Sequence, residues 1–151
     1  MFTKLNLPPY SFRTKREGDK IYIFDDVRKK FLALTPEEWV RQNFIRFLIQ
    51  EKKFPSQLMA VESGLKINQN QFRADLLVYG RTGAALLVAE FKAPSVKINQ
   101  QVFDQIARYN MKFRVTWLIV SNGLSHYCCR MNYEDCTYRF LKDIPAFDEI
   151  L

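Results

Sequence analysis

Hydrophobic and polar positions along the chain repeat with two different periods, and these periods predict where helices and strands lie. In residues 36–53, "PEEWVRQNFIRFLIQEKK", apolar side chains recur at helical spacing. Thr35 suits an N-cap and Pro36 the first helical position, so a helix is expected to begin there and to end before Pro55. A second helical period predicts another helix over residues 99–113.

The remaining apolar runs predict β-strands. A hairpin is expected within residues 20–34, and three runs with short turns between them predict an antiparallel meander: residues 57–67, 72–80 and 84–92. Three more strands are expected at residues 115–121, 124–131 and 136–141. Because a helix separates the strand ending at residue 92 from the one starting at 115, those two strands should be parallel, joined by a right-handed crossover. The predicted fold class is α/β, with a central mixed β-sheet flanked by helices.

The length and composition fit one compact domain over residues 1–151. Hydrophobic residues make up 48% of the 151 positions, enough for a substantial core. Residues 1–20, with Pro8-Pro9 and scattered charges, are expected to form an N-terminal arm. Neither a run of about 18 apolar residues nor an apolar leader is visible, so we expect a cytoplasmic protein and no membrane partner.

The charge is unevenly distributed. The net charge is +7, from 23 Lys and Arg against 16 Asp and Glu. Residues 1–53 hold 12 basic against 7 acidic side chains, and residues 54–133 hold 9 against 4, whereas residues 134–151 hold 2 against 5. Because Lys and Arg displace the counterions of phosphates, a basic body of this kind suits a polyanion such as DNA as partner.

The three cysteines do not indicate a disulfide framework or a zinc site. Cys128, Cys129 and Cys136 are odd in number and suit a reducing compartment. His126 lies two residues before Cys128, but these positions lack the usual spacing of zinc ligands. Strand alternation explains the small apolar cysteines more simply, and we expect the lone histidine to be structural.

A pair of charges ends the apolar strand predicted at residues 84–92. Residues two apart in a strand share a face, so Glu90 and Lys92 are neighbours. If the hairpin turns at residues 80–83, Asp75 lies opposite residues 88–90 on the adjoining strand. Two carboxylates and an ammonium group would then converge at one edge of an apolar sheet.

Such an arrangement needs a further cation. Two carboxylates a few ångströms apart in a low dielectric repel each other by several kcal/mol. Lys92 supplies one positive charge, and Mg²⁺, or Mn²⁺ in its place, takes one or two carboxylates together with phosphate oxygens and water. The pattern therefore indicates a metal site open to a phosphodiester.

These residues resemble a known nuclease family. "RADLLVYG" and "LLVAEFKAP" resemble the PD-(D/E)xK nuclease core, and the longer pattern "TPEEWVRQNFIRFL", "FRADLLVYG", "AEFKAPS" and "QIARY" resembles the N-terminal nuclease domain of type I restriction enzyme R subunits. The resemblance covers residues 34–125 and implies a restriction-endonuclease-like core. It implies that Asp75 and Glu90 bind the metal and that Lys92 is catalytic. The proline of the family pattern is Ala74 here, a mild departure.

The resemblance also implies supporting residues on both helices. A carboxylate from the first helix would be Glu37 or Glu38; at about 100° per residue Glu37 lies on the side of Phe44 and is preferred as the additional metal ligand. Gln105 and Tyr109 match the Q-x-x-x-Y spacing and share a helix face, with an implied role in positioning phosphate or the catalytic lysine. Four basic residues are candidate DNA contacts: Arg41, Arg73, Lys97 and Arg108.

Two functional hypotheses follow. The first is a Mg²⁺-dependent DNA endonuclease, and the second is a catalytically inactive nuclease-fold module that binds nucleic acid or a protein. A strand Glu-x-Lys in isolation is usually an exposed ion pair, but the ordered set of acidic, Glu-x-Lys and Q-x-x-x-Y positions favours the first. The chain lacks the G-x-x-x-x-G-K-[ST] phosphate loop, so a motor or specificity subunit acting in trans is a further candidate partner.

Overall fold

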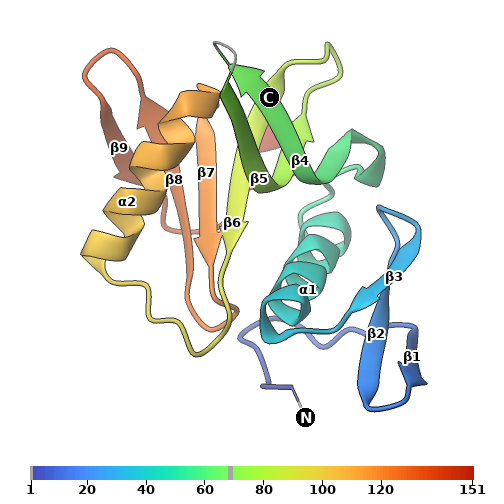
Figure 1. Cartoon of the computed structure of the whole chain (residues 1–151). Coiled ribbons are helices and arrows are strands. Elements are labelled where there is room, and N and C mark those ends of the chain that lie inside the picture. The colour runs from blue at the N-terminus through green and yellow to red at the C-terminus, as the bar shows by residue number, and fades with distance from the viewer. Residues whose placement is uncertain (1, 68–69) are drawn as a thin grey trace.

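The computed structural model describes residues 2–67 and 70–151 and, within them, the side chains outside residues 63–72 (Figure 1). A small antiparallel sheet, in the order β1-β2-β3, precedes a six-stranded sheet in the order β4-β5-β6-β7-β8-β9. The strands are β1 (Thr14–Glu17), β2 (Lys20–Asp25), β3 (Lys30–Ala33), β4 (Met59–Ile67), β5 (Asn70–Tyr79), β6 (Ala85–Phe91), β7 (Trp117–Ser121), β8 (His126–Asn132) and β9 (Thr137–Phe140). The helices are α1 (Pro36–Gln50) and α2 (Gln100–Asn110), with short 3₁₀ turns at Ser56–Leu58, Met111–Phe113 and Phe147–Glu149.

The predicted sheet topology is confirmed. Strands β4, β5 and β6 form an antiparallel meander. Helix α2 then connects β6 to β7, and these two strands pair in parallel, with Leu87 beside Trp117. Strands β8 and β9 continue the sheet antiparallel to β7. The fold is therefore mixed α/β, as the alternating and helical periods indicated.

Both helices begin at side-chain caps. The Thr35 hydroxyl accepts a hydrogen bond from the Glu38 N–H at 3.0 Å, which satisfies one of the free donors of the first turn of α1. The Asn99 side chain accepts from the Val102 N–H at 2.8 Å and caps α2 in the same way. The predicted second helix is correct in position, but its last turn is 3₁₀, and Arg114 ends it in a left-handed conformation (φ 51°).

The N-terminal segment differs from the expected arm. Thr14–Glu17 form strand β1, because Gly18 adopts φ 62° and turns the chain so that Glu17 pairs with Lys20. The residues before β1 pack against the body instead of extending away from it. The indole N–H of Trp39 donates to the Thr3 carbonyl at 2.9 Å.

The N-terminal segment also closes on the turn that follows β7. The Asn6 N–H donates to the Gly123 carbonyl at 2.8 Å. The His126 ring lies between two partners, its Nε2 2.8 Å from the Asn6 carbonyl and its Nδ1 2.7 Å from the Ser121 hydroxyl. A side chain at position 123 would collide with Leu5, since a Cβ there would lie 2.6 Å from Leu5 Cδ2. His126, the lone histidine, therefore links the N-terminal segment at Asn6 to the end of β7 at Ser121.

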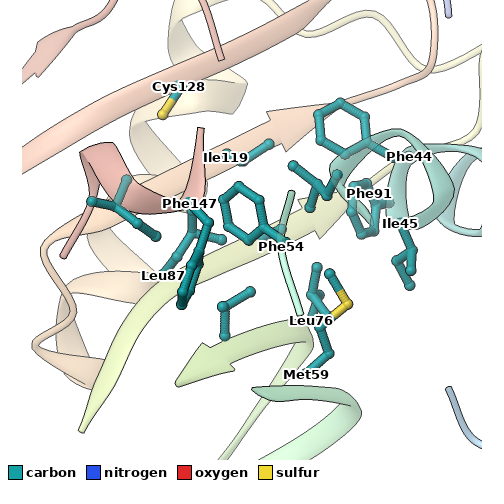
Figure 2. Close-up of a cluster of buried hydrophobic side chains, with 14 of the residues drawn as sticks. Phe44, Ile45, Phe54, Met59, Leu76, Leu87, Phe91, Ile119, Cys128 and Phe147 are labelled. Carbon is teal, nitrogen blue, oxygen red and sulfur yellow. The ribbon is translucent and has the colours of Figure 1, made fainter. Parts of the chain in front are cut away.

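The helices cover opposite faces of the large sheet. One buried cluster joins α1 to Leu76, Leu87 and Phe91 of the sheet and to Phe147 near the C-terminus (Figure 2). The other joins α2 to the alternate sheet residues, including Leu77, Val88 and Leu118. Among the described residues, no helix is long and apolar enough to span a membrane.

Candidate active site

Strand register brings Asp75 and Glu90 together. Leu76 pairs with Ala89, so one residue further along each strand Asp75 lies beside Glu90, at the end of the β5–β6 hairpin. The Phe91 N–H donates to Asp75 Oδ2 at 2.7 Å and fixes that carboxylate. Alternation places both acids on the face of Leu77 and Val88, which α2 covers. The register expected from the turn at residues 80–83 is confirmed.

Lys92 follows immediately beyond β6. Its N–H donates to the Ser121 carbonyl at 2.9 Å, so the parallel ladder with β7 holds the backbone on which the lysine stands. The side chains of Glu90 and Lys92 line one pocket of about 300 Å³. A carboxylate and an ammonium group thus face the same hollow at the edge of the sheet.

Helix α2 supplies the opposite wall of this pocket. Gln105 and Tyr109, one helical turn apart, both line it, together with Arg73 of β5. The Tyr109 hydroxyl accepts a hydrogen bond from the Arg73 N–H at 3.4 Å, which ties the helix to the strand that carries Asp75. The helical spacing predicted for the Q-x-x-x-Y residues therefore places them beside Glu90 and Lys92.

The two glutamates at the start of α1 have different surroundings. Glu37 is exposed; the burial it does have raises its pKa and the charge of Asp75 adds to the rise, whereas Arg41 and Lys92 oppose it. These charged neighbours locate Glu37 at the same edge as Asp75. Burial would raise the pKa of Glu38, but hydrogen bonds from Arg41 and Gln42 hold it below its usual range.

Burial and like charge act together on Glu90. Burial raises the pKa of Glu90 to about 8, and the charge of Asp75 and a hydrogen bond between the two carboxyls add to the rise, while Lys92 opposes it. At neutral pH Glu90 therefore retains its proton. A second negative charge at this edge is unfavourable unless a cation accompanies it.

Arg41 joins this site to a buried ion network. Its guanidinium donates to Glu38 at 2.8 Å and to Glu62 at 3.0 Å, and it lies 3.4 Å from Asp75 Oδ1. Only 5% of its side chain is exposed. Such burial does not suit the DNA contact expected of Arg41; the side chain instead holds three carboxylates of the fold in place. Glu38 and Arg41 are three residues apart on one helix, and this spacing was the sequence pattern that could have indicated an ion pair between them.

Glu62 and Arg28 complete the network and were not predicted. Glu62 lies in β4 on the far side of Asp75 and adopts a left-handed backbone conformation (φ 51°), which is uncommon within a strand. Arg28 contacts the carboxylates of Asp25 at 2.6 Å and Glu38 at 3.2 Å. The contacts that Arg28 makes with Glu38 and Glu62 join different elements of the chain, so no local sequence pattern marks them.

Comparison with known proteins identifies the family of this chain. Residues 36–145 match the profile of the type I restriction enzyme R protein N terminus (HSDR_N). The chain belongs to this family. Its fold resembles the fragment structure of a protein assigned as the HsdR subunit of a type I restriction enzyme from Vibrio vulnificus, with a TM-score of 0.55 and 18% sequence identity. That likeness covers 79% of this chain and 25% of the other, so the chain spans about a quarter of that protein. No curated protein matches significantly.

The remaining basic residues predicted for this R protein N-terminal domain lie at or near its surface. Arg73 stands at the rim of the pocket with 72% of its side chain exposed. Lys97 is exposed on the loop after Lys92, a loop held by a 2.9 Å hydrogen bond from Asn122 to the Val96 carbonyl. Arg108 is exposed on the last turn of α2. All three positions remain candidates for phosphate contact.

The oxygen donors of the HSDR_N domain suit a hard divalent ion that keeps water and phosphate among its ligands. They do not form a metal site closed by protein side chains alone. Among the described residues, no group of three or more His, Cys, Asp or Glu side chains is arranged to hold a metal. Asp75 and Glu90 offer two adjoining carboxylates, and Mg²⁺ commonly takes one or two, with water and phosphate completing its shell. Cys128 and Cys129 are buried, and burial raises the pKa of each thiol to about 12.

The raised pKa of Glu90 predicts how stability depends on pH when no divalent ion is present. The folded protein holds a proton that the unfolded chain loses near pH 4.5, so the free energy of unfolding should fall as pH rises from about 4.5 to 8. Glu90→Gln removes the charge. The variant should match wild type at pH 5 and exceed it by on the order of 2–4 kcal/mol at pH 9.

Urea unfolding in EDTA at pH 5, 7 and 9 measures this difference. The matched control is Glu134→Gln, a change at an exposed glutamate away from the site. It should leave the pH dependence of wild type unchanged. Equal losses of stability between pH 5 and 9 in wild type and Glu90→Gln would contradict the raised pKa of Glu90.

Proposed function

We propose that this domain is a divalent-cation-dependent DNA endonuclease, which hydrolyses phosphodiester bonds at the edge formed by β5, β6 and the two helices. The observation that carries the proposal is the Asp75–Glu90 pair, held in register by β5 and β6, of which Glu90 lines one pocket with Lys92. Membership of the R protein N-terminal family supports a nuclease role. The basic body of the chain, with net charge +7, supports DNA as the substrate.

We propose that Asp75 and Glu90 hold the cation, Mg²⁺ or Mn²⁺, and that Glu37 adds negative charge at the open side without being a third direct ligand. Bound there, such an ion supplies a more acidic water and offsets charge on the phosphate. Two negative carboxylates at a half-buried edge are otherwise unfavourable, which supports this assignment. The Phe91 N–H and Arg41 hold the Asp75 oxygens, so that this ligand is oriented in advance.

The other side chains of the pocket then act on the phosphodiester. The Lys92 ammonium group, on a backbone fixed by β7, would donate to the attacking water or to the phosphate as negative charge builds on it. Gln105 and Tyr109 would position the phosphate from the helix side of the pocket. Arg73 at the rim would contact the neighbouring backbone phosphate, a role that suits its exposed guanidinium.

A supercoiled-plasmid nicking assay tests this function. Wild type is expected to convert plasmid to the nicked form with Mg²⁺ or Mn²⁺, and to lose that activity in EDTA. Calorimetric titration with Mn²⁺ should show that Asp75→Asn weakens ion binding at least tenfold, because one of two charged ligands is lost. Asp143→Asn, at an exposed position remote from the pocket, is the matched control and should bind as wild type.

The second hypothesis gives a different result. An inactive module would bind DNA with an affinity that falls steeply as salt rises, yet would leave plasmid intact with every divalent ion tested. Unchanged ion binding in Asp75→Asn would show that the assigned carboxylates are not the ligands. The phosphate-loop motif is absent from this chain, so we propose that any translocation of DNA is supplied by a partner subunit or another segment.

A further inference from the structure

The small sheet carries aromatic rings on its outer face. Its register pairs Lys15 with Tyr22 and Phe24 with Phe31, so the three rings lie on one face together with the side chains of Arg13 and Lys15. The opposite face bears residues that are fully buried, among them Ile23. In Figure 1 this sheet lies beside α1, on the side away from the six-stranded sheet. We call the surface formed by Arg13, Lys15, Tyr22, Phe24 and Phe31 the aromatic face.

The aromatic face is not explained by packing of the core. Among the described residues, none of its rings belongs to either buried hydrophobic cluster, and all three are only half-buried. The rings are covered by cations instead. The Arg13 guanidinium lies 4.3 Å from the centre of the Phe24 ring and 5.1 Å from that of Phe31. The Lys15 ammonium lies 4.5 Å from the Phe31 ring and 5.8 Å from Tyr22.

Rings interleaved with cations are suited to a nucleic acid whose bases are unpaired. Such bases stack on aromatic side chains and on arginine planes, while Lys and Arg neutralise the phosphates between them. In a duplex the flat faces of the bases are covered by their neighbours, so stacking of this kind selects a single strand. An acidic protein would be attracted by the same cations but would gain nothing from the ring faces.

The small sheet also lies close to the proposed active site. Ala33, the cross-strand neighbour of Tyr22, lines a hollow of about 520 Å³. Glu37 of α1 and Ala93, which follows Lys92 in the sequence, line the same hollow. One hollow therefore adjoins both the edge of the aromatic face and the start of the segment that carries Lys92.

From these contacts we infer that the aromatic face binds an unpaired stretch of DNA and that the domain acts on DNA with a single-stranded region beside the cut. The inference rests on the proposed function for the identity of the substrate. It adds a binding surface, formed by β1–β3, that lies outside the carboxylate site. Ring faces supply sequence-tolerant affinity, and Arg13 and Lys15 supply the salt-dependent part.

Binding of labelled oligonucleotides tests the inference. Fluorescence anisotropy is measured in EDTA, with Asp75→Asn as background so that cleavage does not intervene, using a thymidine oligomer and a blunt duplex. The double variant Phe24→Leu/Phe31→Leu keeps apolar side chains but removes two rings. Its affinity for the single strand should fall about tenfold or more, and that for the duplex less than about threefold. Arg13→Gln/Lys15→Gln should lower the salt slope by roughly 0.7 per cation removed.

The matched control lies on β9, at the opposite end of the chain from the aromatic face. Phe140 is 45% exposed and neighbours the exposed Arg139, so Arg139→Gln/Phe140→Leu removes an equivalent ring and charge elsewhere. This control should bind both oligonucleotides as the background protein does. Thermal melts of every variant show whether the fold is retained.

Photocrosslinking with a bromodeoxyuridine oligomer tests the same contact without any substitution on the aromatic face. Crosslinks to the peptides that carry Tyr22 or Phe31 support the inference, and crosslinks confined to other peptides overturn it. Unchanged single-strand affinity in the ring variant, or equal losses for single strand and duplex, would also overturn it. The two proposals can fail separately. If wild type does not nick plasmid but the ring variant loses single-strand binding, the nuclease function is refuted and the aromatic face is still supported as a binding surface.

Discussion

Lys92→Met is expected to lower the rate of DNA cleavage by about 10²–10³-fold, the loss typical when one preorganised group that stabilises transition-state charge is removed. The methionine side chain has similar length and keeps the apolar part of the lysine, so packing changes little. The backbone is held independently by the bond from the Lys92 N–H to the Ser121 carbonyl. The loss should therefore appear in the rate at saturating DNA, measured by single-turnover nicking.

Two further measurements assign the effect to chemistry rather than to folding or ion binding. Calorimetric affinity for Mn²⁺ should change by less than about threefold in Lys92→Met, because the ammonium group is not a ligand. Lys142→Met, at an exposed lysine in the segment after β9, should cleave at nearly the wild-type rate at saturating DNA. Retention of wild-type cleavage by Lys92→Met would remove Lys92 from the mechanism.

Arg41→Met is expected to cost about 3–5 kcal/mol of folding free energy, since it leaves buried carboxylates without their cation. Glu38 is 7% exposed at its side chain and accepts two hydrogen bonds from Arg41, at 2.8 and 3.1 Å. Arg28 still reaches Glu38 at 3.2 Å, so one partner remains, and the expected loss lies toward the lower end of the range. Urea unfolding at pH 7 measures it.

A charge-retaining variant and a surface variant sharpen this prediction. Arg41→Lys keeps the positive charge but cannot contact Glu38, Glu62 and Asp75 at once, so its loss should be intermediate. Arg73→Met, at a side chain that is 72% exposed, should cost about 0–1 kcal/mol. A loss below about 1 kcal/mol in Arg41→Met would mean that the network contributes little to stability.

Most of the scaffold could be predicted from sequence because its signals are local. The alternation of residues 72–80 and 84–92 and the turn between them determine the register, and that register alone brings Asp75 to Glu90. The crossover helix follows from its 3.6-residue period and its position between two apolar strands. Gln105 and Tyr109 are one turn apart, so the helix delivers both to the same pocket.

The parts that escaped prediction depend on long-range contacts. Strand β1 is polar and fully exposed, so no apolar alternation marks it. The choice between Glu37 and Glu38 depends on Arg28, which lies before the helix and donates to the Glu38 carboxylate at 3.2 Å. The left-handed backbone of Glu62 has no sequence signal at all, because glutamate rarely adopts it without support from surrounding contacts.

The proton held by Glu90 links the effects of pH and of divalent ions on this domain. A divalent ion at the Asp75–Glu90 pair must displace that hydrogen ion, so uptake of one is release of the other. Below pH of about 8, where Glu90 retains its proton, one unit of acidification would then weaken apparent ion affinity about tenfold. Occupancy of the ion site would then depend on pH and on the free Mg²⁺ concentration together, because a lower pH could be offset by more Mg²⁺.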